Sequence, residues 1–361
     1  MTGARDWPDE RFAELLGSRH PILLAPMAGA GGVELAVAAM AGGAVGALPC
    51  ALLDAETVRG QVAEVRSRTA GPLNLNFFCH VMPEGADEDA WHTLLGPYYQ
   101  AYGLGDHPGE GPLRRPFDAD MCAVIEALRP EIVSFHFGLP DEDLLDRVRH
   151  AGCRVLATAT TIAEARCLAE RRVDAVIAQG FEAGGHAGRF LEDSGPEEQM
   201  GLFALLPQVV DAVAPVPVIA AGGIADARGI AAAFMLGASA VQLGTAFLLS
   251  PESLIGGAHR TALHEAPAER TGFTNLFTGG LARGLPTRLT DELGRVRAEA
   301  PPYPLASAAL LPIAKAANAR GESGFQPMWA GQAARLAPAL PAAELAETLA
   351  RETLALLARR A

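Results

Sequence analysis

The sequence predicts an α/β protein in which eight parallel strands close into a (β/α)8 TIM barrel. Eight short apolar runs alternate strictly with helical patterns over the first 250 residues. Such alternation requires parallel strands joined by crossover helices. Eight strands within roughly 230 residues match a closed barrel better than an open, doubly wound sheet. No Gly-x-Gly-x-x-Gly motif follows the first run, which argues against the dinucleotide-binding form of the open sheet.

The predicted strands are short, apolar and rich in β-branched residues. They are Pro21–Met27, Val45–Pro49, Leu73–Phe78, Ile132–Phe137, Arg154–Ala159, Val173–Ile177, Val216–Ala221 and Ala240–Thr245. Runs of this length and composition are typical of buried strands in a parallel sheet.

Helical patterns fill the intervals between the strands. The predicted helices are Val33–Ala41, a helix that follows Asp54, Asp89–Tyr102, Met121–Leu128, Asp141–His150, a helix from Thr161 to Arg171, Ala204–Val213 and Ala227–Met235. We expect Asp54 and Asp226 to cap the helices that follow them, because a carboxylate accepts hydrogen bonds from the free N–H groups of a first turn. Thr161 and Glu164 have the spacing of a capping box.

Two regions depart from the alternation within and after the barrel. Residues 81–116, rich in Gly, Pro and acidic residues, predict an insertion after the third strand. Residues 251–324 hold a Gly-rich and a Pro-rich piece and predict a cap that carries the substrate-binding region. Residues 325–361 end in an amphipathic pattern over Ala342–Arg360, which predicts a helix that packs back on the barrel. Residues 1–250 therefore form the predicted cofactor-binding barrel.

The bulk composition narrows the class of protein. A formal net charge of -13 without a basic block argues against a nucleic-acid partner. Five cysteines without metal-type spacing indicate a reducing compartment and no metal site. The uncharged stretch Leu35–Leu53 is long enough to span a membrane, but its glycines and a proline favour a buried helix, turn and strand. No signal peptide is predicted, and we expect a cytoplasmic enzyme.

Two glycine-containing turns predict a phosphate site. Gly222 and Gly223 follow the seventh predicted strand, and Gly244 and Thr245 end the eighth. In a TIM barrel, ligands bind at the carboxyl ends of the strands, and the loops after strands seven and eight commonly bind phosphate. Glycine lets the backbone N–H groups approach the anion closely.

Three carboxamides end otherwise apolar predicted strands on the same rim. Asn76, Gln179 and Gln242 each offer a donor and an acceptor, which suits the edge of a heterocycle. The alternative for each is that it satisfies a neighbouring backbone group. Three such groups beside a phosphate site suggest flavin mononucleotide (FMN).

The stretch Gln179–Gly188 combines four glycines with a histidine. Gly184 and Gly185 directly precede His186. Glycines here allow close approach to a flat ligand, and an imidazole can serve as acid, base or hydrogen-bond donor. The alternative is a flexible loop with a surface histidine.

Several strings of residues, which span about Pro21 to Thr245, resemble those of one enzyme family. They are Ala25-Pro26-Met27, Asn76-Phe77-Phe78, Gln179-Gly180-Phe181-Glu182-Ala183-Gly184-Gly185-His186, Ala220-Ala221-Gly222-Gly223-Ile224 and Gln242-Leu243-Gly244-Thr245-Ala246-Phe247. The chain resembles the nitronate monooxygenases, formerly called 2-nitropropane dioxygenases, and several features are similar to their class I branch. The string that ends at His186 is the most specific.

The resemblance implies an FMN enzyme that uses O2 to oxidise alkyl nitronates to a carbonyl compound and nitrite. Neutral nitroalkanes are the further substrate class that the resemblance allows. It implies His186 as the catalytic residue. The FMN-binding residues it implies are Met27, Asn76, Gln179, Gly184, Gly185, Gly222, Gly223, Gln242, Gly244 and Thr245.

Three further residues are candidates for the substrate side of the pocket: His136, Tyr303 and Lys315, the last being the only lysine in the chain. For His136 and Lys315, a backbone-bonded histidine and a solvated helix face are the alternatives. Two other functions stay open at this point. One is an FMN-dependent NAD(P)H reductase of the enoyl-acyl carrier protein reductase or quinone reductase type. The other is a flavin- or phosphate-binding barrel without redox turnover. We expect a monomer or homodimer.

Overall fold

The computed structural model describes residues 7–105, 113–191 and 198–359. Its main sheet contains eight parallel strands in the order β1-β9-β8-β6-β5-β4-β3-β2. The strands are β1 Ile22–Leu24, β2 Gly46–Pro49, β3 Leu73–Phe78, β4 Ile132–His136, β5 Arg154–Ala159, β6 Ala175–Gln179, β8 Val218–Ala221 and β9 Ala240–Leu243. A parallel bridge between Leu23 and Val45 joins β1 to β2 and closes the ring. The predicted TIM barrel is confirmed.

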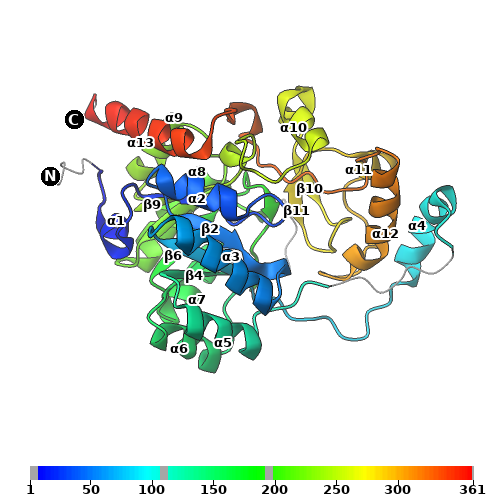
Figure 1. The fold of residues 1–361 in the computed structure, drawn as a ribbon, viewed down its shortest axis with the longest axis horizontal. Coiled ribbons are helices and arrows are strands. Elements are labelled where there is room, and N and C mark those ends of the chain that lie inside the picture. Colours follow the sequence, from blue (N-terminus) through cyan, green and yellow to red (C-terminus); the bar gives the residue numbers. More distant parts are fainter. Residues whose placement is uncertain (1–6, 106–112, 192–197, 360–361) are drawn as a thin grey trace.

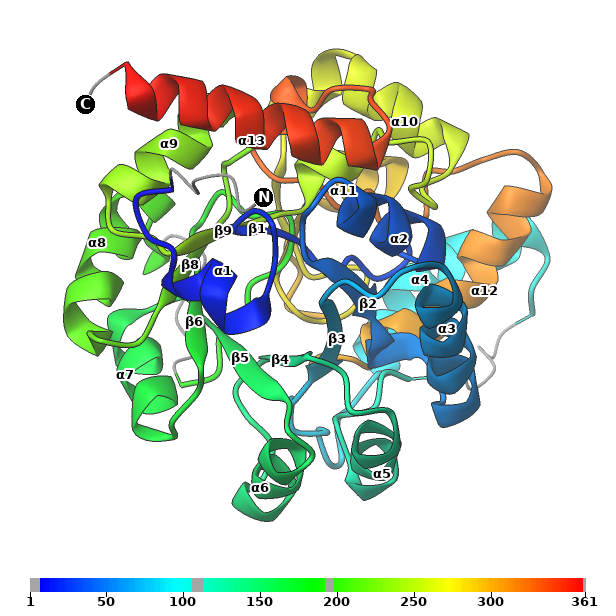
Figure 2. The ribbon, with the colours of Figure 1, turned by 60° about the vertical axis from the view of Figure 1, so that its left-hand side comes forward.

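Alternate residues of each strand face two different cores, as a parallel barrel requires. On β8, Val218 and Ala220 pack outward against the helices, while Ile219 and Ala221 belong to the cluster inside the barrel. Helix α1 (Arg11–Leu16) contributes Phe12 and Leu16 to the inner cluster. It crosses the end of the barrel that faces the viewer in Figure 2. The amino-terminal end of the barrel is thus filled, and a ligand site is left to the opposite end.

Helices cover the outside of the barrel, and three of them begin at the capping residues that were predicted. The outer helices are α2 Val33–Ala41, α3 Ala55–Arg68, α5 Ala119–Leu128, α6 Glu142–His150, α7 Ile162–Glu170, α8 Leu202–Val213 and α9 Ala227–Met235. Asp54 accepts a hydrogen bond from the Thr57 N–H and Asp226 one from the Gly229 N–H. Thr161 and Glu164 form the expected capping box. These cap predictions are confirmed because they depend only on local spacing.

The C-terminal helix α13 (Ala342–Ala358) packs against α2 and α9, and both views show it lying along the barrel. A Cβ on Gly42 would lie 2.8 Å from the Cβ of Ala346, so glycine allows α2 to end against α13. Thr353, a polar residue on the buried face, donates to the Leu349 carbonyl oxygen at 2.7 Å. No helix of the described residues is both long and apolar enough to span a membrane.

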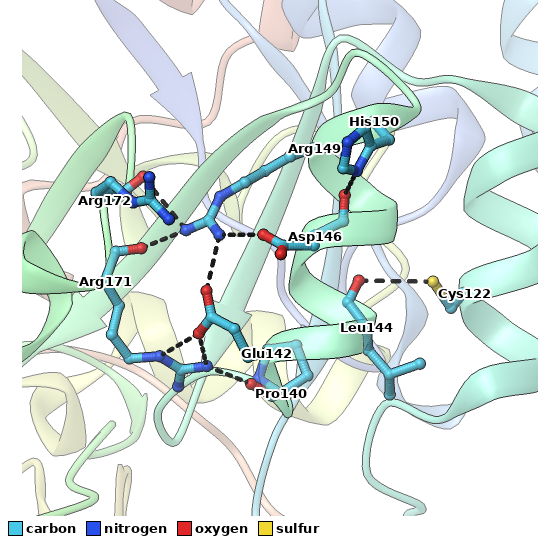
Figure 3. A network of polar contacts seen from close by, with 9 residues as sticks. All are labelled: Cys122, Pro140, Glu142, Leu144, Asp146, Arg149, His150, Arg171 and Arg172. Atoms are coloured by element: carbon cyan, nitrogen blue, oxygen red, sulfur yellow. Dashed lines mark hydrogen bonds and ion pairs between the residues drawn. The ribbon is translucent and has the colours of Figure 1, made fainter.

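A surface network of ion pairs ties α6 to the end of α7, on the outside of the barrel (Figure 3). Glu142 accepts hydrogen bonds from Arg149 at 3.1 Å and from Arg171 at 3.0 Å. Arg171 also donates to the Pro140 carbonyl oxygen at 2.8 Å. The neighbouring Arg171 and Arg149 side chains hold the pKa of the Glu142 carboxyl below its usual value. Exposed pairs of this kind contribute little to stability, and none of these residues lines the cavity described below.

A second layer lies beyond the carboxyl ends of the strands, at the right in Figure 1. It contains α4 (Asp89–Tyr102), α10 (Gly257–His264), α11 (Arg288–Leu293) and α12 (Ala306–Ala319). Helix α4 packs against α12, with the Trp91 Nε1–H donating to the Ala306 carbonyl oxygen at 3.2 Å and the Tyr99 hydroxyl to that of Ala309 at 2.5 Å. The insertion at 81–116 and the segment 251–324 therefore share one hydrophobic cluster.

The sequence did not predict a small antiparallel sheet in this layer. Its strands are β7 (Gly185–His186), β11 (Ala282–Gly284) and β10 (Gly272–Thr274), and His186 pairs with Ala282. The alternative of a flexible loop around His186 is therefore wrong, because backbone pairing to β11 holds this segment. The sixth barrel strand was also misplaced: it begins two residues later than expected and runs through Gln179.

Candidate active site

A cavity of about 600 Å³ lies at the carboxyl ends of the barrel strands, beneath the second layer. Twelve of the predicted site residues line this cavity. They are Met27, Asn76, His136, Gln179, Gly184, Gly185, His186, Gly222, Gly223, Gln242, Gly244 and Thr245. Residues from six strands or their following turns thus converge on one site, as expected for a TIM barrel.

The other two predicted substrate residues do not line the cavity. Tyr303 stands behind the wall, where its ring packs edge-on against His186 with 5.2 Å between ring centroids. Lys315 is exposed on α12. Leu310, Leu311 and Ala314 of the same helix line the cavity, but Lys315 lies about 100° further around the helix than Ala314. The structure therefore does not support Lys315 as a pocket residue, and the alternative of a solvated helix face holds.

The carboxamide of Gln179 holds the segment that carries His186. Its Nε2 donates to the His186 carbonyl oxygen at 2.9 Å, and its Oε1 accepts from the Gly188 N–H at 2.7 Å. The alternative that Gln179 satisfies neighbouring backbone groups therefore holds for Oε1 and for one of the two Nε2 hydrogens. One Nε2 hydrogen remains for a ligand.

Gln242 has a polar atom that a ligand could satisfy. Its Oε1 is buried and has no hydrogen-bond partner in the described structure, although Gln242 lines the cavity. A buried unpaired acceptor costs about 1–3 kcal/mol, so such a group is expected to meet a ligand donor or water. Asn76 differs, because its Nδ2 already donates to the side chain and carbonyl oxygen of Ser134 at 2.9 and 3.2 Å.

The glycines of the site are required for different reasons. Gly222 and Gly223 have φ values of 108° and 70°, which L side chains rarely adopt, and they expose backbone at the cavity wall. Gly184 is needed for packing instead, because its Cβ would lie 2.6 Å from the Gly331 nitrogen. The Gly331 N–H also donates to the Thr245 hydroxyl oxygen at 2.9 Å. The turns after β6 and β9 are thus joined to the C-terminal segment.

His186 lies in an aromatic enclosure with one polar partner. Its ring contacts those of Phe78, Phe137 and Trp329, with centroids 5.7 to 6.2 Å apart. Its Nε2 lies 2.8 Å from the Thr278 hydroxyl oxygen. The Thr278 hydrogen has a second acceptor, the Gly280 carbonyl oxygen, but at 3.4 Å. We infer that the hydroxyl donates to the nearer Nε2, which would leave the ring hydrogen of His186 on Nδ1.

Burial keeps this imidazole neutral. Loss of solvent lowers the pKa of His186 well below its ordinary value, and Arg114, His136 and His80 lower it further. Phe137, one of the enclosing rings, has a φ of 64° although it is not glycine. Such backbone strain in a bulky residue is concentrated at functional sites.

His136 supports the same segment from β4. Its Nδ1 lies 3.1 Å from the Thr158 hydroxyl oxygen and its Nε2 lies 3.2 Å from the His186 carbonyl oxygen. Burial lowers the pKa of His136 to about 4. Both sequence interpretations of His136 therefore apply: it lines the cavity, and it is bonded to backbone.

This shift predicts a pH dependence of stability. Because His136 stays neutral in the folded protein, only the unfolded chain takes up its proton as the pH falls from about 6.5 towards 4. The free energy of unfolding is fully retained above this window and falls within it. We expect His136→Asn to reduce the slope of unfolding free energy against pH by about 1.4 kcal/mol per pH unit. Urea unfolding at several pH values measures it; the same slope in His136→Asn and in the exposed-site control His150→Asn would contradict it.

Two acidic residues hold the loops around the cavity. Both carboxylate oxygens of Glu182 accept from the Leu202 N–H, at 3.0 and 2.9 Å, at the start of α8. Glu182, to which the sequence assigned no role, therefore fixes its loop to the start of α8. Glu164, beyond its cap, also accepts from the Phe190 N–H at 2.7 Å. The sequence could not predict the contact between Glu164 and Phe190, because it depends on tertiary structure. The same is true of the Thr278 contact with His186 and of the place of Arg114 in the cavity lining.

Among the described residues, no group of three or more His, Cys, Asp and Glu side chains is placed to hold a metal ion. The site instead combines a glycine-lined wall, an unpaired carboxamide oxygen and an enclosed neutral imidazole. Such a site suits an organic ligand with a phosphate group and a small second reactant.

Comparisons with known proteins agree with this description. A model of the nitronate monooxygenase family matches residues 9–352. The nitronate monooxygenase of Paraburkholderia phytofirmans is 43% identical over 343 residues, covering 94% of this chain and 93% of that protein. The solved nitroalkane oxidase from Streptomyces ansochromogenes is 36% identical with a TM-score of 0.88, covering 97% and 100% of the two chains. FabK from Thermotoga maritima is 27% identical with a TM-score of 0.74, covering 97% of each chain.

The family model matches nearly the whole chain, and every described residue that lines the cavity lies within the matched range. The protein is therefore an oxidoreductase that belongs to the nitronate monooxygenase family.

Proposed function

We propose that this protein is an FMN-dependent monooxygenase that oxidises alkyl nitronates with O2 to a carbonyl compound and nitrite. The observation that carries the proposal is the convergence of His186 and all ten predicted FMN-binding residues on one cavity. Membership of the family and the likeness to a nitroalkane oxidase support the reaction class.

The residues present fit FMN. Gly222 and Gly223 would bind the phosphate through backbone N–H groups, together with Gly244 and Thr245 on the adjacent turn. The unpaired Gln242 Oε1 would accept a hydrogen bond from the flavin ring edge. When bound, FMN would supply the one-electron redox chemistry between the nitronate and O2.

His186 would bind the nitronate rather than generate it. With its hydrogen on Nδ1, the neutral imidazole can donate to a nitronate oxygen, and no described residue competes for that hydrogen. Its strongly lowered pKa makes it a weak base for a neutral nitroalkane. A nitronate, which has already lost its proton, is therefore the better-matched substrate. The surrounding aromatic rings exclude water and strengthen the hydrogen bond.

Gly222→Ala is expected to weaken FMN binding by at least roughly tenfold, or ~1.4 kcal/mol. Alanine at a φ of 108° is strained, and its Cβ would lie 3.0 Å from the Ala183 nitrogen in the cavity wall. Gly237→Ala is the matched control, with a φ of 97° and a Cβ 3.0 Å from Val210, and Gly237 does not line the cavity. The flavin-to-protein ratio of the purified variants measures the loss of FMN binding. Equal flavin loss in both variants would count against the phosphate assignment.

The experiment for the proposed function mixes the purified protein anaerobically with ethyl nitronate and, in separate samples, with NADH and NADPH. We expect loss of the flavin absorbance with the nitronate alone, followed by nitrite release when O2 is admitted. Rapid reduction by a nicotinamide together with indifference to the nitronate would overturn the proposal and favour the reductase. A colourless protein that binds no flavin would also overturn it.

A further inference from the structure

Arg114 is a cation inside the cavity wall without a visible counterion. Its side chain lines the cavity, and its buried Nε has no hydrogen-bond partner. Over residues 7–105, 113–191 and 198–359, the guanidinium takes part in none of the hydrogen bonds or ion pairs. Loss of solvent lowers the pKa of Arg114, but an arginine remains charged at neutral pH. A desolvated charge is costly unless it is paired, so the site calls for an anion.

The lining offers Arg114 no internal anion. Glu182 is the one carboxylate among the described lining residues, and it is bonded to the Leu202 N–H. The three described histidines of the lining, His136, His186 and His259, have lowered pKa values from burial and are neutral. Among the described lining residues, Arg114 is therefore the one cation, and the one carboxylate is already engaged by a backbone N–H.

The FMN phosphate is not the expected partner of Arg114. The phosphate-type turns follow β8 and β9, whereas Arg114 lies between β3 and α5. In the strand order, β3 is separated from β9 by β2 and β1, which places it on the opposite side of the ring. Arg114 instead lies near His186, because its carbonyl oxygen contacts the His80 ring and the rings of His80 and His186 both pack against Tyr303. The unpaired cation thus belongs to the end of the cavity that holds His186.

The surroundings fix Arg114 in this place. The Arg114 carbonyl oxygen lies 3.2 Å from His80 Nε2, and the His80 ring packs edge-on against Tyr303 at 4.8 Å. Gly280 leaves room for the Tyr303 ring, because a Cβ at this position would lie 3.1 Å from it. The same turn supplies Thr278, the partner of His186 Nε2. One scaffold therefore positions both the cation and the imidazole.

We propose that Arg114 binds the negatively charged O–N–O group of the nitronate, opposite the hydrogen bond from His186, and so selects the anion over the neutral nitroalkane. The proposal rests on the proposed function for its substrate. A guanidinium can donate two parallel hydrogen bonds to a planar anion with two oxygens. Nitroethane has the same two oxygens but no net charge, so it gains less from the cation.

The test compares Arg114→Met, which removes the charge, with Arg114→Lys, which keeps it. Arg115→Met, at the exposed neighbouring arginine, is the matched control. We expect Arg114→Met to raise the KM for ethyl nitronate and the Kd for inorganic nitrite roughly 10- to 100-fold, as loss of hydrogen bonds to a charged group predicts. Arg114→Lys should recover part of both losses, and Arg115→Met should match the wild type. Nitrite binding is measured by calorimetry, which needs no turnover.

Salt gives a second readout. Attraction between Arg114 and the anion is screened as ionic strength rises, so the nitronate KM of the wild type should increase with salt and that of Arg114→Met should not. If the wild type oxidises ethyl nitronate and Arg114→Met leaves KM and the nitrite Kd unchanged, this inference fails while the proposed function stands. If the wild type does not oxidise nitronates but binds nitrite more tightly than Arg114→Met does, the proposed function fails and the anion site stands.

Discussion

His186→Ala is expected to lower kcat/KM for ethyl nitronate by roughly 10- to 100-fold, because it removes a hydrogen bond to a charged group. Any turnover of neutral nitroethane should fall further, by roughly 10²- to 10⁴-fold, since that reaction also needs a base. Flavin content should stay at the wild-type level, because Gln179 and His136 bond to the His186 backbone, which alanine retains. Steady-state oxygen consumption with each substrate measures the effect.

Two variants sharpen this test. His186→Asn places a carboxamide N–H near the position of Nδ1, so it should restore part of the nitronate activity and none of the nitroethane activity. His264→Asn changes an exposed histidine of α10 and should match the wild type. Unchanged nitronate kinetics in His186→Ala would remove the donor role that the Thr278 contact assigns to this imidazole.

The sequence predicted the barrel and the placement of most cavity residues because both follow from local patterns. A buried parallel strand reveals itself by its apolar run, and barrel geometry brings the carboxyl ends of such strands together. Asn76, Gln179 and Gln242 could therefore be assigned to one rim before their contacts were known. Their individual roles could not, because whether a carboxamide meets a ligand or a backbone depends on the neighbouring loop. Gln179 proved largely committed to the His186 segment, while Gln242 retained an unpaired oxygen.

The contacts that set the chemistry of His186 come from remote parts of the chain. Thr278 lies 92 residues from His186 along the sequence, and Arg114 comes from an insertion whose composition indicates only an irregular segment. Neither has a periodicity or spacing that links it to the histidine. Lys315 differs: an isolated lysine in an apolar context was a candidate for the site, but its position on the helix exposes it to solvent, as the alternative expected. Local patterns thus indicate where a site lies, and tertiary packing determines its charge.

Glu164 is the buried carboxylate that connects two of the loops around this site. It is 1% exposed. Its Oε2 accepts from the Thr160 N–H at 2.6 Å, the Thr160 hydroxyl at 2.8 Å and the Thr161 N–H at 3.2 Å. Its Oε1 accepts from the Phe190 N–H at 2.7 Å. Phe190 follows the His186 segment closely in the chain, and its ring lies 3.3 Å from where a Cβ on Gly138 would be. One side chain therefore holds the turn after β5 and the chain that leaves β7.

Glu164→Ala is expected to lower the free energy of unfolding by about 2–6 kcal/mol, or ~1–3 kcal/mol for each of the Thr160 and Phe190 N–H groups left buried without an acceptor. Glu170→Ala changes an exposed glutamate on the same helix and should stay within about 0.5 kcal/mol of the wild type. Urea unfolding of the flavin-loaded proteins compares the two. A loss of only about 0.5–2 kcal/mol in Glu164→Ala would show that Glu164 acts only as a helix cap, since an N-cap interaction alone contributes that much. A loss beyond that range, with a lowered nitronate kcat/KM at full flavin content, requires the second contact to Phe190, through which the carboxylate positions the His186 segment.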